Sequence, residues 1–141
     1  MSRMLITLAA CAAVAALPGT ALAAPAKLAA TLAGANETAG GDTDGSGAFA
    51  GEMDTSTGDV CFTLTVAKLG KVTAAHIHKG AAGADGDPVA PLSVTGADGD
   101  TCIAAEPDLL KAIVAAPADY YVNVHTADFP KGAVRGQLAA K

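Results

Sequence analysis

Strict two-residue alternation in residues 60–66 is the strongest constraint on the fold of this chain. Apolar side chains occupy every second position, and polar or small side chains occupy the positions between them. In an extended strand, successive side chains point to opposite faces, so the apolar set shares one face. We expect this face to point inward. Its members are Val60, Phe62, Leu64 and Val66.

Six further segments have strand-like composition and lie between clusters of glycine and aspartate. They are residues 27–32, 48–53, 72–78, 89–92, 120–126 and 134–139. One helix is expected over residues 107–115, because Pro107 suits a first helical position and Pro117 suits a stop. The pattern predicts an all-β fold: an antiparallel Greek-key or immunoglobulin-like β-sandwich with one short helix.

The N-terminal residues are typical of a secretory signal peptide. A positive start is followed by an apolar run over residues 4–17, and Ala21-Leu22-Ala23 supplies a small-x-small cleavage pattern. The run is too short to span a bilayer, which needs about 20 apolar residues. We therefore expect a signal peptide at 1–23, a single domain at 24–141, and a periplasmic or secreted protein. Leu8-Ala9-Ala10-Cys11 leaves lipidation as a less favoured alternative.

Two cysteines, Cys61 and Cys102, remain after the expected cleavage, because Cys11 leaves with the signal. In an oxidising compartment a single pair predicts one disulfide. Its ends are 102 − 61 = 41 residues apart, a loop worth about 3–4 kcal/mol on the chain-entropy estimate. A cysteine-ligated metal or redox pair is less favoured, because no Cys-x-x-Cys spacing is present.

The charge excludes several classes of partner. The full chain carries a net charge of −5, and removal of Arg3 with the signal makes it 8 − 14 = −6. Such a balance argues against binding to nucleic acid and to anionic membrane surfaces.

All three histidines lie in two patterned segments, at 75–80 and 121–126. If Ile77, Val122 and Val124 face the core, His76, His78 and His125 face the other way. Should the two strands be neighbours, three imidazoles would converge and leave a fourth coordination position open. Imidazole ligation suits Cu(II) or Zn(II) and does not suit Ca²⁺ or Mg²⁺. The pattern predicts a three-histidine metal site, for copper in preference to zinc.

Neighbouring residues are candidates for outer contacts of this site. Tyr121 and Asn123 share the histidine face, whereas Tyr120 is expected to point to the core. Arg135 could orient an anion near the histidines, but an ion pair with Glu37 or Asp128 is favoured. The alternative is that the histidines are architectural and only hydrogen-bond to the backbone or to Asn123 and Thr126.

The chain resembles the CHRD (chordin-type) domain family over roughly residues 27–139. The resemblance is carried by five segments: residues 32–37, the run 76–83 with Pro88-Val89 and Leu92, residues 120–126, residues 130–132, and Arg135-Gly136-Gln137-Leu138. Gly86-Asp87-Pro88 departs from the family pattern by an extra aspartate, which affects the loop after His78. The resemblance implies a secreted β-sandwich module and does not by itself imply an activity.

These observations lead to one favoured function and two alternatives. The favoured function is metal storage, scavenging or delivery outside the cytoplasm, without catalysis. The first alternative is an extracellular module that binds a protein or polysaccharide, and a homodimer is also open. The second is a mononuclear copper redox enzyme with superoxide dismutase-like geometry. Cu/Zn superoxide dismutase itself needs six histidines and an aspartate for two metals, which three histidines cannot supply.

Other chemistry finds little support. Residues 42–47 are similar to the start of an EF-hand calcium loop, but Met53 stands where a bidentate glutamate is required. A hairpin loop is favoured there. No Ser-His-Asp order, nucleotide-binding glycine loop or pair of catalytic carboxylates is present, so no catalytic residue is predicted.

Overall fold

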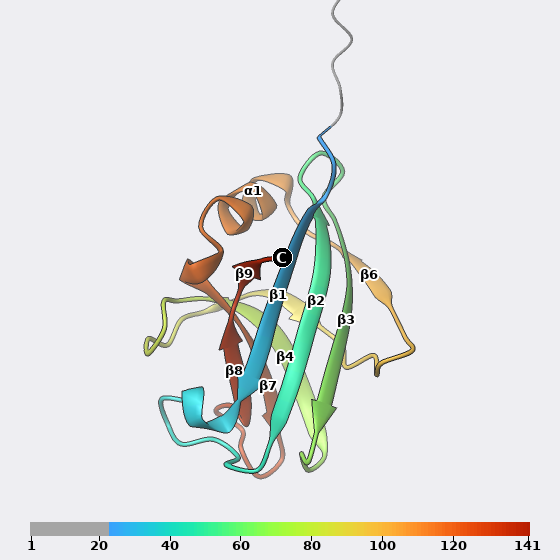
Figure 1. The fold of residues 1–141 in the computed structure, drawn as a ribbon. Helices are drawn as coiled ribbons and strands as arrows, with labels where there is room; N and C mark the ends of the chain where they lie inside the picture. Colours follow the sequence, from blue (N-terminus) through green and yellow to red (C-terminus); the bar gives the residue numbers. More distant parts are fainter. Residues whose placement is uncertain (1–22) are drawn as a thin grey trace, which may run out of the picture.

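A computed structural model describes residues 23–141, so the expected signal peptide, apart from its last residue, lies outside the described residues. The described chain forms one antiparallel sheet in the order β5-β4-β7-β8-β1-β2-β3-β6, with β9 added to β1 (Figure 1). The strands are β1 (Ala26–Ala33), β2 (Ser46–Asp54), β3 (Asp59–Ala67), β4 (Val72–Lys79), β5 (Pro88–Leu92), β6 (Thr101–Ala104), β7 (Tyr120–Thr126), β8 (Val134–Gln137) and β9 (Ala139–Ala140). One α-helix, α1 (Pro107–Ala115), joins β6 to β7.

The sheet curls into a nearly closed barrel. Its two end strands approach each other, since a hollow between them is lined by Val89 and Pro91 of β5 and by Ala104 at the end of β6. The predicted all-β antiparallel fold with one short helix is confirmed. The finer prediction, a two-sheet sandwich with Greek-key connections, stays a prediction.

The interior of the barrel holds the apolar core. Val60, Phe62 and Leu64 are buried there as the alternation predicted, and Val66 is partly buried. Helix α1 packs over the core through Leu110 and Ile113, whose side chains have no solvent exposure. Burial of such side chains is the main source of stability in a domain of this size.

The disulfide joins two neighbouring strands at one end of the sheet. Cys61 of β3 pairs directly with Cys102 of β6, and their sulfur atoms are bonded. The predicted disulfide is therefore confirmed. Strand β6 itself was not predicted, because its four residues are too few to show a period. The expected strand at 134–139 is divided at Leu138, which is buried and separates β8 from β9.

Two loops cover the outer face of β4, β7 and β8. One follows β4 and runs over residues 80–87, and the other joins β7 to β8 over residues 127–133. As a result, polar residues that point away from the core, such as Asn123 and Arg135, are still 1% and 3% exposed. Within the described part of the chain, no helix is both long and apolar enough to cross a membrane.

Candidate metal centre

The pairing of β4 with β7 brings the three histidines together. His76 lies opposite Asn123, His78 opposite Tyr121, and Ala74 opposite His125. Directly paired residues point to the same side of a sheet, so all three imidazoles lie on the outer face. The ring centroids are 5.5 Å apart for His76 and His78, 5.4 Å for His76 and His125, and 5.9 Å for His78 and His125. The predicted gathering of the rings is confirmed.

The ring nitrogens lie close enough together that they could hold one metal ion. One nitrogen from each histidine can be chosen so that all three lie within 4.8 Å of one another. Bonds of about 2.0–2.1 Å to a tetrahedral ion would bring such nitrogens to about 3.3 Å. Binding of an ion would therefore require the rings to move toward one another. Within residues 23–141, this is the one group of histidine, cysteine or acidic side chains that meets such a distance.

Backbone carbonyls orient two of the three rings. Nδ1 of His78 lies 2.8 Å from the carbonyl oxygen of Gly86, and Nδ1 of His125 lies 3.1 Å from that of Pro130. A carbonyl can only accept, so each Nδ1 carries a proton, and in the neutral ring Nε2 then keeps its lone pair. Such a hydrogen bond to the second nitrogen is what metal-ligating histidines commonly show. Nε2 of His78 is buried and has no hydrogen-bond partner among residues 23–141.

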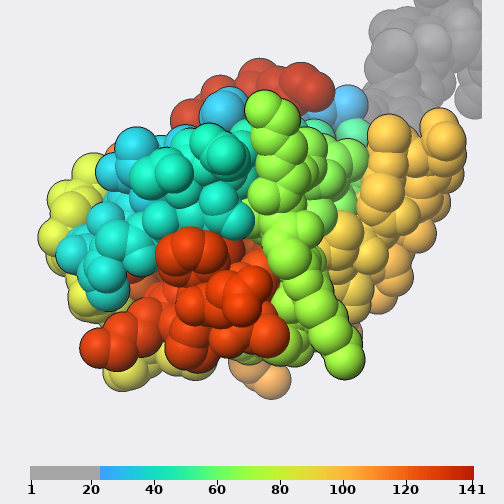
Figure 2. All heavy atoms as spheres, turned by 90° about the horizontal axis from the view of Figure 1, so that it is seen from below, coloured from blue at the N-terminus to red at the C-terminus, as the bar shows by residue number. Residues whose placement is uncertain are grey.

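The two loops hold these carbonyls in place. The amide of Gly86 donates to the hydroxyl of Tyr121 at 3.2 Å, and a Cβ at Gly86 would overlap the carbonyl oxygen of Lys79. Residues 127–133 are held at one end of the barrel, where Figure 2 shows them against the β3–β4 turn and the segment before β2. These contacts include two backbone hydrogen bonds: the amide of Ala127 donates to the carbonyl of Lys71, and the amide of Asp42 donates to the carbonyl of Ala133.

The environment of His76 and His78 favours their neutral form. Burial lowers the pKa of His76, and the neighbouring His125 lowers it further. Burial also lowers the pKa of His78, and positive charge on His76, His125 or Arg135 adds to this effect, while the hydrogen bond with Gly86 opposes it. A neutral imidazole is the form that binds a metal.

An aromatic and ionic layer lies beside the rings. Tyr121 stacks on His78 with ring centroids 5.0 Å apart, and Cζ of Arg135 lies 4.4 Å from the centroid of Tyr121. Arg135 pairs with buried Glu37 at 2.9 Å, one of the two predicted partners, and with Asp85 at 2.6 Å. Tyr120 points into the core, as expected.

Three features of this region were missing from the sequence analysis. They are the carbonyl of Gly86, the carbonyl of Pro130 and the ion pair of Arg135 with Asp85. Every residue has a carbonyl, so sequence carries no signal for the first two. The extra aspartate noted near 86–88 marks the loop but does not identify Asp85 as the partner.

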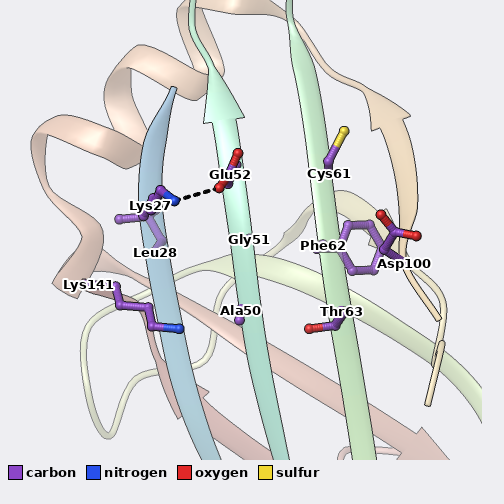
Figure 3. A pocket seen from close by; sticks show the side chains of 10 residues that line it. All are labelled: Lys27, Leu28, Ala50, Gly51, Glu52, Cys61, Phe62, Thr63, Asp100 and Lys141. Carbon is purple, nitrogen blue, oxygen red and sulfur yellow. Dashed lines mark ion pairs between the residues drawn. The ribbon is translucent and has the colours of Figure 1, made fainter. Parts of the chain in front are cut away.

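Another hollow on the surface lies away from the histidines. It measures about 540 Å³ and lies over β1, β2 and β3 (Figure 3). Lys27 and Glu52 form an ion pair across it at 2.9 Å, and Lys141 and Thr63 line it farther along. Both charged partners of the pair are more than half exposed, so this surface lacks the burial of the histidine cluster.

Comparison with known families matches residues 28–138 to the CHRD domain. The match covers most of the described chain and includes all three histidines. No curated protein and no solved structure matches the chain.

Proposed function

The chain belongs to the CHRD domain family, and we propose that this member binds one transition-metal ion through His76, His78 and His125. Copper is favoured over zinc, and the role is storage, scavenging or delivery outside the cytoplasm. The observation that carries the proposal is the arrangement of His78. Its Nδ1–H is held by a carbonyl, while its buried Nε2 has no partner among the described residues.

Burial of an unpartnered nitrogen has a cost that a metal bond would remove. An unsatisfied buried polar atom costs about 1–3 kcal/mol, and native proteins retain few of them. The donor set is imidazole only, which suits Cu(II) and Zn(II). Three protein ligands leave one position for water or an acceptor molecule, which suits an ion that must be exchanged.

The proposed location outside the cytoplasm has two supports. The disulfide between Cys61 and Cys102 is stable in oxidising compartments. The sequence of residues 1–23 has the anatomy of a secretory signal.

Tag-free protein exported from its host tests the proposal. We expect about one equivalent of copper or zinc by elemental analysis, or saturable uptake by the metal-free form. The double variant His76→Ala/His78→Ala should lose both, whereas Thr63→Ala, on the outer face of β3, should lose neither. A fully folded protein whose thermal stability copper and zinc leave unchanged would contradict metal binding and favour a module for an extracellular protein or polysaccharide.

The open coordination position also admits the redox alternative. Superoxide and peroxide turnover by the copper-loaded protein tests it. Turnover no faster than free copper would leave storage, scavenging or delivery as the function.

A further inference from the structure

We propose that Asn123 is a positioning residue for the metal: its amide links Glu37 to His76 and holds His76 so that its Nε2, like those of His78 and His125, faces the ion. The inference rests on the proposed metal site and assigns the outer contact that the third histidine needs. It concerns which ring nitrogen of His76 binds the ion, and which contact selects that nitrogen.

His76 breaks the pattern set by the other two histidines. Nδ1 of His78 and Nδ1 of His125 each meet a backbone carbonyl, at 2.8 Å and 3.1 Å. Nδ1 of His76 is buried and has no partner in the described structure. A ring with neither nitrogen fixed can present either one to an ion, so it is the least organised of the three ligands.

Asn123 is placed to supply the missing contact. It lies directly opposite His76 in the β4–β7 pairing, on the same face of the sheet. The Cβ atoms of such pairs are about 4.5–5.5 Å apart, within reach of these two side chains after small rotations. Asn123 is 1% exposed, and its Oδ1 is also buried without a partner. A proton on His76 Nδ1, donated to Asn123 Oδ1, would give both of these atoms a hydrogen-bond partner.

Glu37 lies at the other side of Asn123. Its Oε2 accepts from Nε of Arg135 at 2.9 Å, while its Oε1 is buried and unpartnered. The pKa of Glu37 is raised overall, because burial outweighs the lowering effect of Arg135; the amide of Asn123 also lowers this pKa, which places it near the carboxylate. The Arg135 guanidinium favours the ionised carboxylate.

The Glu37 carboxylate decides which group donates and which accepts in both proposed hydrogen bonds. An ionised Glu37 only accepts, so the amide must turn its Nδ2–H₂ toward Oε1. Oδ1 of Asn123 then faces His76 and requires a proton on Nδ1, which leaves the lone pair on Nε2. These two hydrogen bonds satisfy three of the four unpartnered buried atoms. The fourth is His78 Nε2, the nitrogen assigned to the metal.

Glycines enclose the carboxylate end. A Cβ at Gly132 would lie 2.6 Å from both carboxylate oxygens of Glu37, and a Cβ at Gly41 would lie 2.6 Å from its Cγ. Gly132 also has a φ of 139°, which other residues rarely adopt. The side chain of Glu37 is 1% exposed as a result, so water does not compete freely for Oε1.

Three variants test the role of Asn123. Asn123→Leu removes both amide contacts, and Asn123→Asp keeps an acceptor for His76. Gln137→Leu is the matched control, because Gln137 is an amide on the adjacent strand β8 whose Nε2 donates only to backbone carbonyls. The readouts are the His76 tautomer in metal-free protein, from long-range ¹H–¹⁵N NMR near pH 8, and the affinities for Cu(II) and Zn(II).

We expect His76 to carry its proton on Nδ1 in the wild type, in Asn123→Asp and in Gln137→Leu. In Asn123→Leu it should become a mixture of tautomers, and metal affinity should fall about 10–100-fold, as for other outer contacts of metal sites. A wild-type His76 protonated mainly on Nε2 would overturn the inference. So would an Asn123→Leu protein with unchanged tautomer and affinity.

Failure of the proposed function gives a different result. If the wild type binds neither metal, the metal site is wrong, yet the tautomer of His76 still reports whether the Glu37–Asn123–His76 contacts exist. Should Asn123→Leu fail to fold, the wild-type tautomer and its retention in Asn123→Asp decide the question.

Discussion

The two faces of strands β4, β7 and β8 are built in opposite ways: the inner face is fully buried, whereas on the outer face His78 is buried and His76 and His125 are half-buried. On the inner face Ile77, Val122 and Val124 have no solvent exposure and pack in an apolar core. On the outer face, one residue along the same strands, lie the histidines and Asn123. In the described part of the chain, four buried side-chain atoms have no partner, and all belong to this outer layer or to Glu37, which packs against it.

This difference separates a stabilising face from a candidate functional face within single strands. The inner face gains free energy from burial without polar costs. The outer face buries individual polar atoms without giving them a partner, which lowers stability unless a partner or ligand reaches them. Perturbed polar groups gathered at one buried spot are a common mark of a functional site.

The largest effect expected on the outer face is loss of the buried ion pair. Arg135→Met leaves the Glu37 carboxylate buried and unpaired, which should lower the free energy of unfolding by about 3–5 kcal/mol. Urea denaturation measures this change. The double variant Glu37→Gln/Arg135→Met should recover much of the loss, and a single variant of wild-type stability would show that this layer does not depend on charge pairing.

The inner face should respond mainly in stability. Ile77→Ala opens a cavity in the core and should lower the free energy of unfolding by about 2–5 kcal/mol. Denaturant unfolding checks this, with metal affinity of the folded fraction measured alongside. A loss below about 1 kcal/mol would mean that the core on this side is loosely packed.

His76, the adjacent residue on the outer face, should respond mainly in metal affinity. His76→Leu removes a proposed ligand together with an unpartnered nitrogen, so metal affinity should fall by more than the about 10–100-fold of an outer contact. Leucine also leaves buried Oδ1 of Asn123 without its proposed donor, so the free energy of unfolding of the metal-free protein should fall by about 1–3 kcal/mol. Calorimetric titration and thermal unfolding separate the two quantities, and equal metal affinity in variant and wild type would remove His76 from the site.

The smallest effect expected is a pH dependence of the metal-free protein. The pKa of His78 is lower in the folded chain than its ordinary 6.5, so the unfolded chain binds more protons between the two values. The free energy of unfolding should therefore be highest above pH 6.5 and fall as the pH decreases toward the folded value.

His78→Gln sharpens this measurement, because its amide can still donate to Gly86 and does not titrate. The difference between wild type and variant between pH 5 and 7.5 isolates the histidine from the carboxylates. Parallel curves would contradict the neutral, buried state assigned to His78.

Much of the fold was predictable because the relevant signals are local. Alternation located β3 and β7, and proline at both ends located α1. Strand β6 and the break at Leu138 were missed, because a four-residue strand and a single kink depend on their neighbours in the sheet. Local patterns do not predict which strands pair. The pairing is what joins the strands into one curled sheet.

The sequence by itself determined which side of each strand the histidines occupy, since successive residues in a strand must point to opposite faces. It also determined the cysteine pair, because only two cysteines remain outside the expected signal. Tertiary structure alone decided that β4 lies beside β7 and that two loops turn the carbonyls of Gly86 and Pro130 toward the rings. These contacts depend on backbone groups that every residue carries, so only the path of the chain in space could select them.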